Sequence, residues 1–346
     1  MGISLGVVRD ERYLEHKTGL VHPEHPNRLK YLYRLLDNEF PDALVDIEPQ
    51  PVGLEYLELV HTPFYIKKVL KTADRGFTNL AFDTPASAQT YMAAWLAVGG
   101  CIRSVEALLS GQCRVAFSLV RPPGHHALRD RAGGFCIFNN LAVTARYAMK
   151  KRGMKRILII DWDVHHGNGL QDIFYSEKEV LYVSSHFTSI YPHTGEWEET
   201  GAGEGEGYTV NLPLSVGMED DDVLYLYQEV LGPVVRRFRP EMIMIAAGFD
   251  LHHLDSVSRS SVTESAFRRL IKLVLDFSAE VDDPPVMMAL EGGYKLPGLV
   301  NSVREVIREL LAYDKPNSCS NEPTERAANI VEKARRIHSA YGVWAD

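Results

Sequence analysis

Two carboxylates and an imidazole alternate along the segment Asp161–Gly169, which reads DWDVHHGNG. Residues i, i+2 and i+4 at the end of a strand point the same way, so Asp161, Asp163 and His165 are expected to share one face. Buried carboxylates are costly unless a cation neutralises them, and a divalent metal does so. The pattern therefore predicts a metal site, and its structural alternative is a helix N-cap region with satisfied polar side chains.

A third protein ligand is needed, because a catalytic zinc takes about three and leaves one position for water. Asp250 is the best candidate, since it follows another apolar run in the sequence AAGFD. An aspartate in that place could instead cap the following helix. Two aspartates and one histidine are more anionic than a three-histidine site and could accept Zn²⁺, Fe²⁺ or Co²⁺, with zinc as the default.

Two further motifs could serve a metal-bound water. His125 and His126 stand in RPPGHHA, where two prolines and a glycine fix an extended loop, and adjacent histidines there suit proton transfer. Other His-His pairs occur at 165/166 and 252/253, so this pair alone is not diagnostic. Tyr294 closes the sequence EGGY, and a phenol is a good donor to an oxyanion. The simpler reading of EGGY and of GGFC at 133–136 is a glycine turn with a core aromatic.

The elements that must position these residues alternate between short apolar runs and segments with helical periodicity. The runs are apolar almost throughout, as in strands of a mainly parallel sheet with helices on both faces. The expected strands are the N-terminal run before Arg9 and residues 115–120, 156–160, 180–183, 242–246 and 286–290. The expected helices are residues 90–109, 141–152, 221–238, 264–278 and 299–312, and Ser261 with Glu264 has the spacing of a capping box. The polar motifs follow the carboxyl ends of the runs, where ligand crevices form in α/β sheets, so we expect them to converge.

Composition narrows the function classes. With 346 residues and 45% hydrophobic residues, the chain can bury a large core, and its 37 basic and 46 acidic residues show no basic run typical of direct nucleic-acid binding. The four cysteines form no C-x-x-C pair, and no apolar stretch is expected to reach the length of a membrane span. We therefore expect a cytoplasmic protein, or a nuclear one in a eukaryote, without a membrane partner. An oligomer is left open.

RPPGHHA, GGFC, DWDVHHGNG, AAGFD and LEGGY occur in this order, and with them the sequence resembles the zinc-dependent histone deacetylase family, which includes bacterial acetylpolyamine amidohydrolases and acetoin-utilisation proteins. The resemblance covers roughly residues 1–312. It implies the arginase-deacetylase fold, an α/β fold with a mainly parallel eight-stranded sheet between helices. We expect one catalytic domain at 1–314, with a linker at 315–323 and a final amphipathic helix at 324–341 within the tail to residue 346.

The resemblance also implies roles for individual residues. Asp163, His165 and Asp250 correspond to the zinc ligands, and His126 to the general base and acid. His125, oriented by Asp161, corresponds to its electrostatic partner. The resemblance implies that Tyr294 polarises the substrate carbonyl. It implies a substrate tunnel lined by Gly134, Phe135, Tyr191 and Val257. It also implies an internal acetate channel near Arg28 and a structural potassium ion near Asp161, Asp163 and Ser184.

Three positions separate this chain from parts of the family. Asn168 stands where one class has aspartate, so the pKa of His126 should be lower than with a carboxylate partner. Tyr294 is not the histidine of weakly active members. Val257 occupies the place where polyamine-selective members carry glutamate, although the loop after Asp250 lacks the Gly-Gly usual there.

The resemblance therefore favours removal of acetyl groups from the lysines of a peptide or protein. Hydrolysis of acetylated small amines such as polyamines is the main alternative. An arginase-like reaction needs a second metal, but Gly167 stands where its bridging carboxylate would be. A non-catalytic reader of acylated tails would be expected to lack a catalytic group, and none is missing.

Overall fold

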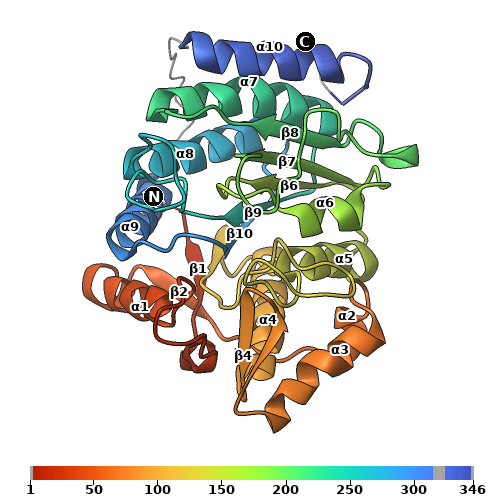
Figure 1. The fold of residues 1–346 in the computed structure, drawn as a ribbon. Helices are drawn as coiled ribbons and strands as arrows, with labels where there is room; N and C mark the ends of the chain where they lie inside the picture. The colour runs from red at the N-terminus through yellow and green to blue at the C-terminus, as the bar shows by residue number, and fades with distance from the viewer. Residues whose placement is uncertain (1–2, 315–323, 344–346) are drawn as a thin grey trace.

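The computed structural model describes residues 3–314 and 324–343 and is built around an eight-stranded sheet (Figure 1). Every strand pair in this sheet is parallel, and the strand order is β2-β1-β5-β10-β9-β6-β7-β8. Its strands are β1 (Leu5–Val8), β2 (Leu44–Ile47), β5 (Val115–Ser118), β6 (Ile157–Asp161), β7 (Val180–His186), β8 (Thr209–Pro213), β9 (Met242–Ala247) and β10 (Val286–Leu290). The predicted eight-stranded parallel sheet is confirmed.

The central strands form where the sequence is apolar without alternation. Every residue of β1, β5, β6, β7, β9 and β10 is buried, as expected for strands covered on both faces. All six expected strands are present, within a few residues at their ends. β2 and β8 were not predicted from the residues. β2 is half exposed at one edge, and β8 at the other edge carries polar Thr209 and Asn211.

Helices flank the sheet on both sides (Figure 1). α4 packs against β1, β5, β10 and α5, whereas α1, α9, α8 and α7 pack in a row on one another. The helices are α1 (Asn27–Glu39), α2 (Leu54–Leu57), α3 (Pro63–Leu70), α4 (Thr90–Leu109), α5 (Asn140–Arg152), α6 (Asn168–Phe174), α7 (Asp220–Phe238), α8 (Glu264–Glu280), α9 (Leu296–Ala312) and α10 (Glu325–His338), with 3-10 turns η1 (Glu11–Glu15), η2 (Lys71–Asp74) and η3 (Gly203–Gly205). A separate antiparallel hairpin, β3 (Phe77–Ala81) and β4 (Thr84–Ser87), lies outside the sheet.

The capping box predicted at Ser261 and Glu264 is wrong. α8 begins at Glu264, and the hydroxyl that caps it belongs to Thr263, which accepts a hydrogen bond from the Ser265 N–H at 3.2 Å. Ser261 is therefore too far from the first turn to cap it. A capping box that the sequence analysis did not identify begins α7, between Glu219 and Asp222.

The last described helix, α10, is amphipathic, as predicted. α10 packs against α7 and β8, and the Thr324 hydroxyl caps it by accepting from the Ala327 N–H at 3.3 Å. The linker predicted at 315–323, which includes Cys319, lies outside the described residues.

α4 is, by length and hydropathy alone, capable of crossing a membrane, which the sequence analysis did not expect of any segment. In this fold 72% of its most apolar window is buried inside the protein. That burial is typical of the core helix of a globular domain.

The strand order brings the predicted motifs together. β5, β10, β9 and β6 are four consecutive strands of the sheet, and each is followed directly by one of the polar motifs. Because these strands are parallel, their carboxyl ends meet at one edge. The sheet thus brings residues that are up to about 170 positions apart in the sequence together at its carboxyl edge.

Candidate active site

Asp163, His165 and Asp250 form one cluster at the carboxyl edge of β6 and β9. Their ligand atoms all lie within 4.8 Å of one another. His165 Nδ1 lies 3.0 Å from Asp163 Oδ1 and 3.0 Å from Asp250 Oδ2. The structure therefore brings together the three residues that the sequence predicted as ligands, with Nδ1 as the ring nitrogen that faces the carboxylates.

Backbone hydrogen bonds fix these carboxylates. Asp163 accepts from the N–H groups of His165 at 2.8 Å and Gly292 at 2.8 Å, and Asp250 Oδ1 accepts from the Val164 N–H at 3.0 Å. A Cβ on Gly292 would lie 2.1 Å from Asp250 Oδ2 and 2.5 Å from Asp163 Oδ2. Only glycine at 292 lets the backbone approach both acids this closely.

The cluster fits a divalent cation. Asp250 Oδ2 is fully buried, and it has no hydrogen-bond donor despite its closeness to the imidazole. Burial and the neighbouring Asp163 carboxylate raise the pKa of Asp250. Burial would lower the pKa of His165, yet the two aspartate carboxylates beside its ring raise the pKa to about 10. Two oxygens and one nitrogen that together demand positive charge are a donor set suited to zinc.

Two histidines stand beside this cluster, each held by its own partner. His125 Nδ1 donates to Asp161 Oδ2 at 3.1 Å, and His126 Nδ1 donates to the amide oxygen of Asn168 at 2.8 Å. Their ring centroids are 3.9 Å apart, and the ring of His126 is 5.9 Å from that of His165. The pairings predicted from the sequence are both present.

The two rings have opposite electrostatic environments. Burial alone would lower the pKa of His125, but the carboxylates of Asp161 and Asp163 raise it to about 10. Burial lowers the pKa of His126 well below its usual value, and the positive charges of His125 and His165 lower it further. At neutral pH His125 carries a proton and His126 does not. A neutral imidazole with a free Nε2 is the state required of a general base.

Tyr182 is a second hydrogen-bond donor to Asp161. Its hydroxyl donates to Asp161 Oδ2 at 2.9 Å, the oxygen that also accepts from His125. Gly167 lies in the same space, because a Cβ there would be 2.1 Å from Asp161 Oδ2 and 2.6 Å from the Tyr182 hydroxyl. Gly167 supplies no carboxylate to bridge two metal ions, and its lack of a side chain leaves room for the Asp161–His125 hydrogen bond.

Glu291 is a residue of the site that the sequence analysis did not single out. Its buried carboxylate accepts from the N–H groups of Gly124 at 2.7 Å and His125 at 3.1 Å, and its Oε1 has no partner. Burial raises the pKa of Glu291 to about 7, against the opposing effect of His125. The carboxylate therefore ties the end of β10 to the loop that carries both histidines.

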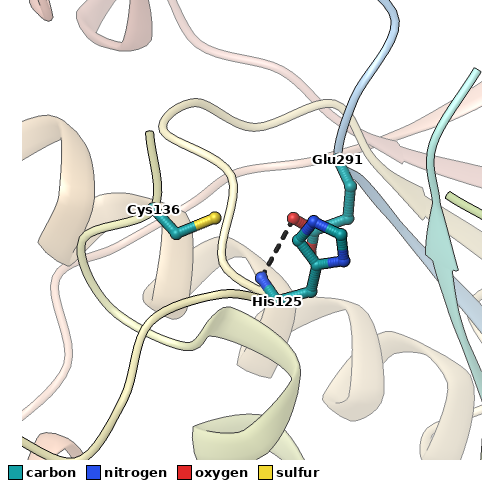
Figure 2. Close-up of side chains that lie close together, drawn as sticks. All are labelled: His125, Cys136 and Glu291. Carbon is teal, nitrogen blue, oxygen red and sulfur yellow. Dashed lines mark hydrogen bonds between the residues drawn. The ribbon is translucent and has the colours of Figure 1, made fainter. Parts of the chain in front are cut away.

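Figure 2 shows His125, Cys136 and Glu291 turned toward one another. One ligand atom of each lies within 4.8 Å of the others. This group is a weaker metal site than the first. His125 Nδ1 already pairs with Asp161, and Glu291 Oε2 already accepts from two backbone N–H groups. Burial and the nearby Glu291 raise the pKa of Cys136 well above its usual range, so the thiol stays protonated.

Tyr294 is positioned by a second acid that the sequence analysis passed over. Asp255 Oδ2 accepts from the backbone N–H groups of Tyr294 at 2.7 Å and Lys295 at 3.0 Å. Burial, with the Asp250 and Asp163 carboxylates, raises the pKa of Tyr294 well above 10. The phenol therefore keeps its proton and remains a donor at neutral pH.

Three of the four residues predicted to wall a tunnel contact the site. The Phe135 ring meets that of Tyr294 edge-on at 5.6 Å, and the Tyr191 ring meets that of His126 at 4.9 Å. A Cβ on Gly134 would lie 2.2 Å from His126 Cδ2. Val257 lies half-buried on the loop after Asp250, and no described contact joins it to these side chains. The tunnel itself stays a prediction.

Arg28 is almost completely buried beneath the EGGY segment. Its guanidinium donates to the carbonyl oxygens of Gly293 at 2.7 Å and Glu291 at 2.5 Å, and it lies 5.1 Å from the centroid of the Tyr294 ring. It also pairs with Glu24 at 3.2 Å. These contacts place Arg28 behind Tyr294, and its predicted role in an acetate channel stays a prediction.

Comparison with known proteins adds an independent finding. The family model described as histone deacetylase domain matches residues 22–310. The chain is 34% identical to a probable deacetylase of Archaeoglobus fulgidus, over 97% of this chain and 98% of that protein. It is 33% identical to a histone deacetylase-like amidohydrolase of Pseudomonas aeruginosa, over 86% of this chain and 82% of the relative.

A solved structure is similar throughout. The crystal structure of the HDA15 HD domain superposes with a TM-score of 0.91 at 35% identity, covering 98% of this chain and 95% of that one. The eight-stranded parallel sheet between helices and this match together confirm the predicted arginase-deacetylase fold.

Proposed function

Because the chain belongs to the histone deacetylase family of hydrolases, we propose that it is a zinc-dependent amidohydrolase that removes acetyl groups from lysine side chains. The observation that carries the proposal is the convergence of the Asp163–His165–Asp250 cluster with two histidines, of which His125 is protonated and His126 is neutral. A metal cluster alone would specify no reaction. A neutral base beside it specifies hydrolysis.

Asp163, His165 and Asp250 would hold the metal. A divalent ion there supplies Lewis acidity, which acidifies water and polarises an amide carbonyl. Zinc is the proposed ion, and Fe²⁺ or Co²⁺ would suit the same donors. A structural potassium ion near Asp161, Asp163 and Ser184 is a further proposal that rests on the family alone.

The proton is carried by His126. Its Nδ1 is engaged by Asn168, so Nε2 takes the proton from the attacking water. The same nitrogen then gives that proton to the leaving amine as the amide C–N bond breaks, and the products are acetate and a free amine. His125, protonated against Asp161, keeps the pKa of His126 low and so keeps the base available.

Tyr294 acts on the oxygen of the substrate. Its phenol stays protonated in this site and donates a hydrogen bond to the oxyanion that develops during attack. Asp255 and Arg28 hold the segment that presents this ring, through the backbone of residues 291–295. These two residues position the catalytic group and need not touch the substrate.

The choice of lysine over a polyamine rests on Val257. A valine offers no charge to the distant ammonium of an acetylated polyamine, whereas the long apolar stem of lysine needs none. The aromatic pair Phe135 and Tyr191 beside the histidines and Tyr294 suits such a stem.

Acetate release from an acetyl-lysine peptide and from acetylspermidine tests the proposal. We expect the peptide to be the better substrate and the His126→Ala variant to lose at least about a hundredfold in kcat. His253→Ala is the matched control, because that exposed imidazole bonds the Val262 carbonyl oxygen at 3.0 Å and stacks on His252, and it contacts none of the catalytic residues named above. A higher kcat/KM for acetylspermidine would assign the enzyme to small amines. Full activity of His126→Ala would contradict the mechanism.

A further inference from the structure

A surface groove of about 340 Å³ lies between α3–η2 on one side and β3 on the other. We refer to it as the basic groove, and none of its residues belongs to the site described above. Its lining residues are Phe64, Lys67, Lys68, Lys71, Thr72, Arg75, Thr78, Asn79 and Leu80.

The basic groove carries positive charge that the protein itself does not neutralise. Lys67, Lys68, Lys71 and Arg75 are exposed, and no ion pair involves any of them within the described residues. Asp74 is the one acidic residue in the segment 63–81. Since the whole chain has a formal charge of -9, this concentration of cations is a local exception.

A second observation points to a ligand in the same place. The side chain of Thr72 lines the groove, is only 2% exposed, and its Oγ1 has no hydrogen-bond partner. A buried hydroxyl without a partner costs free energy, and a ligand oxygen in the groove would accept from it. Beside it Phe64 is 82% exposed and adds an apolar surface.

Both walls of the groove are tied to the loop that carries Gly134 and Phe135. On one wall the Thr62 N–H, at the start of α3, donates to the Arg129 carbonyl oxygen at 3.0 Å. On the other, Asp83 Oδ2 at the tip of the β3–β4 hairpin accepts from the Gly134 N–H at 3.0 Å. Leu80 and Asp83 are three residues apart, so their Cα atoms are at most about 11 Å apart. Figure 1 shows the hairpin extending from α3 toward the loops at the sheet edge.

We propose that the basic groove docks an acidic segment of the protein substrate while its acetyl-lysine occupies the active site. The inference rests on the proposed deacetylase function and narrows its substrate class to chains with carboxylates about three to eight residues from the acetyl-lysine. Three of the four cations are lysines, whose flexible point charges suit several carboxylates better than one rigidly held phosphate. The net charge of the whole protein opposes an extended polyanion such as nucleic acid.

Matched peptides test the docking site on the zinc-loaded, full-length protein. Two pairs of peptides are used, one with the varied residues before the acetyl-lysine and one with them after it. Within a pair, the residues three to eight positions from the acetyl-lysine include four glutamates in the acidic peptide and four glutamines in the neutral one. One exposed ion pair changes an equilibrium constant by about 1.4- to 5-fold. Several such pairs together predict that one of the acidic peptides has a KM about tenfold lower than its neutral counterpart. We expect kcat to differ by less than about twofold and the advantage to shrink at about 0.5 M salt.

The test variant is Lys67→Gln with Lys71→Gln and Arg75→Gln. Lys68 is left in place, because its Nζ donates to the Leu80 carbonyl oxygen at 3.3 Å and so supports the groove wall. The triple variant should raise KM for the acidic peptide to that of the neutral one and leave the neutral peptide unchanged. Thr72→Val keeps the side-chain shape and should raise KM about two- to fivefold for the acidic peptide alone.

The control is Lys30→Gln with Lys150→Gln and Lys155→Gln, three exposed lysines elsewhere whose loss changes the net charge equally. Equal KM values for the acidic and neutral peptides in the native protein would overturn the proposal. So would equal effects of the two triple variants, because the whole-protein field would then be responsible.

A binding measurement separates failure of the proposed deacetylase function from failure of the proposed docking in the basic groove. If no peptide is hydrolysed, anisotropy with a fluorescent acidic peptide that lacks acetyl-lysine still measures docking, and binding lost only in the groove variant supports it. Absence of that binding overturns it. A third outcome is that the protein binds a single-stranded oligonucleotide, that the groove variant abolishes this binding, and that acidic and neutral peptides bind equally. This outcome would assign the groove to nucleic acid and refute the peptide proposal.

Discussion

Replacing Asn168 with aspartate changes the charge beside His126 with little change in shape. The Asn168 amide oxygen accepts from His126 Nδ1 at 2.8 Å, and a carboxylate oxygen can take the same place. An amide orients the imidazole but does not stabilise its protonated form as a carboxylate does. Asn168→Asp therefore isolates the electrostatic part of this pair.

The size of the effect follows from the distance. Opposite unit charges about 4 Å apart interact by about 4 kcal/mol at an effective dielectric constant of about 20. At about 1.36 kcal/mol per pKa unit this is an upper limit of about 3 units, and close carboxylates usually shift a partner by about 1 to 3. We expect the pKa of His126 to rise by that amount from its lowered native value.

The sign of the pH effect is fixed by the role of the base. A general base works unprotonated, so kcat/KM is lost as pH falls through its pKa, and the lowered pKa of His126 places this acid limb below pH 6.5 in the native protein. In Asn168→Asp the limb moves to higher pH. At a pH below both pKa values, activity should be at least about tenfold lower in Asn168→Asp than in the native protein, whereas the two proteins converge above the new pKa.

The assay is the pH profile of kcat/KM for one acetyl-lysine peptide, measured with zinc in excess. Asn329→Asp is the control, because it adds the same charge at an exposed position of α10, which packs on α7 and β8. An acid limb that stays within about 0.3 units of the native one in Asn168→Asp would refute His126 as the base. A limb that moves equally in both variants would show a field effect of the whole protein.

Three further changes test other parts of the site. Tyr294→Phe should lower kcat by about 10²- to 10³-fold with little change in KM, because it removes one donor to the oxyanion; an unchanged kcat would exclude the phenol from the reaction. Glu291→Ala should lower kcat, and Glu291→Gln should recover most of it, because an amide oxygen can still accept from the two N–H groups of the histidine loop; equal losses would mean that charge matters more than position. Gly292→Ala should weaken zinc binding about 10- to 100-fold in a chelator competition, since its Cβ would lie 2.1 Å from Asp250 Oδ2, and native affinity would show that the acids can move aside.

The sequence was most informative where a segment is buried on all sides. The strand 286–290 and the helix 90–109 were predicted with their observed bounds, because apolar residues fill both elements and polar residues flank them. β2 is half exposed, so its residues carry no such signal. The β3–β4 hairpin lies outside the sheet, and neither the partly exposed β3 nor the partly polar β4 gives an apolar run in the sequence.

The metal cluster and the two histidine pairs were predictable because their side chains belong to short motifs at strand ends. Glu291 and Asp255 were not, although both lie in or beside those motifs. Each acts through backbone N–H groups, and Glu291 reaches Gly124 across 167 residues of sequence. Such contacts depend on strand order, which local patterns do not encode. A carboxylate directly after an apolar strand, as in LEGGY, is the signal that could have marked Glu291.

The central claim is that the Asp163–His165–Asp250 cluster holds the metal on which hydrolysis depends. Acetate release and bound zinc should be measured together on one preparation, before chelation, after it and after stepwise return of zinc. We predict that activity disappears with the zinc and returns in proportion to it, saturating near one ion per chain, and that Asp163→Ala recovers neither. Full activity in protein stripped of metal, or an active Asp163→Ala, would contradict the claim.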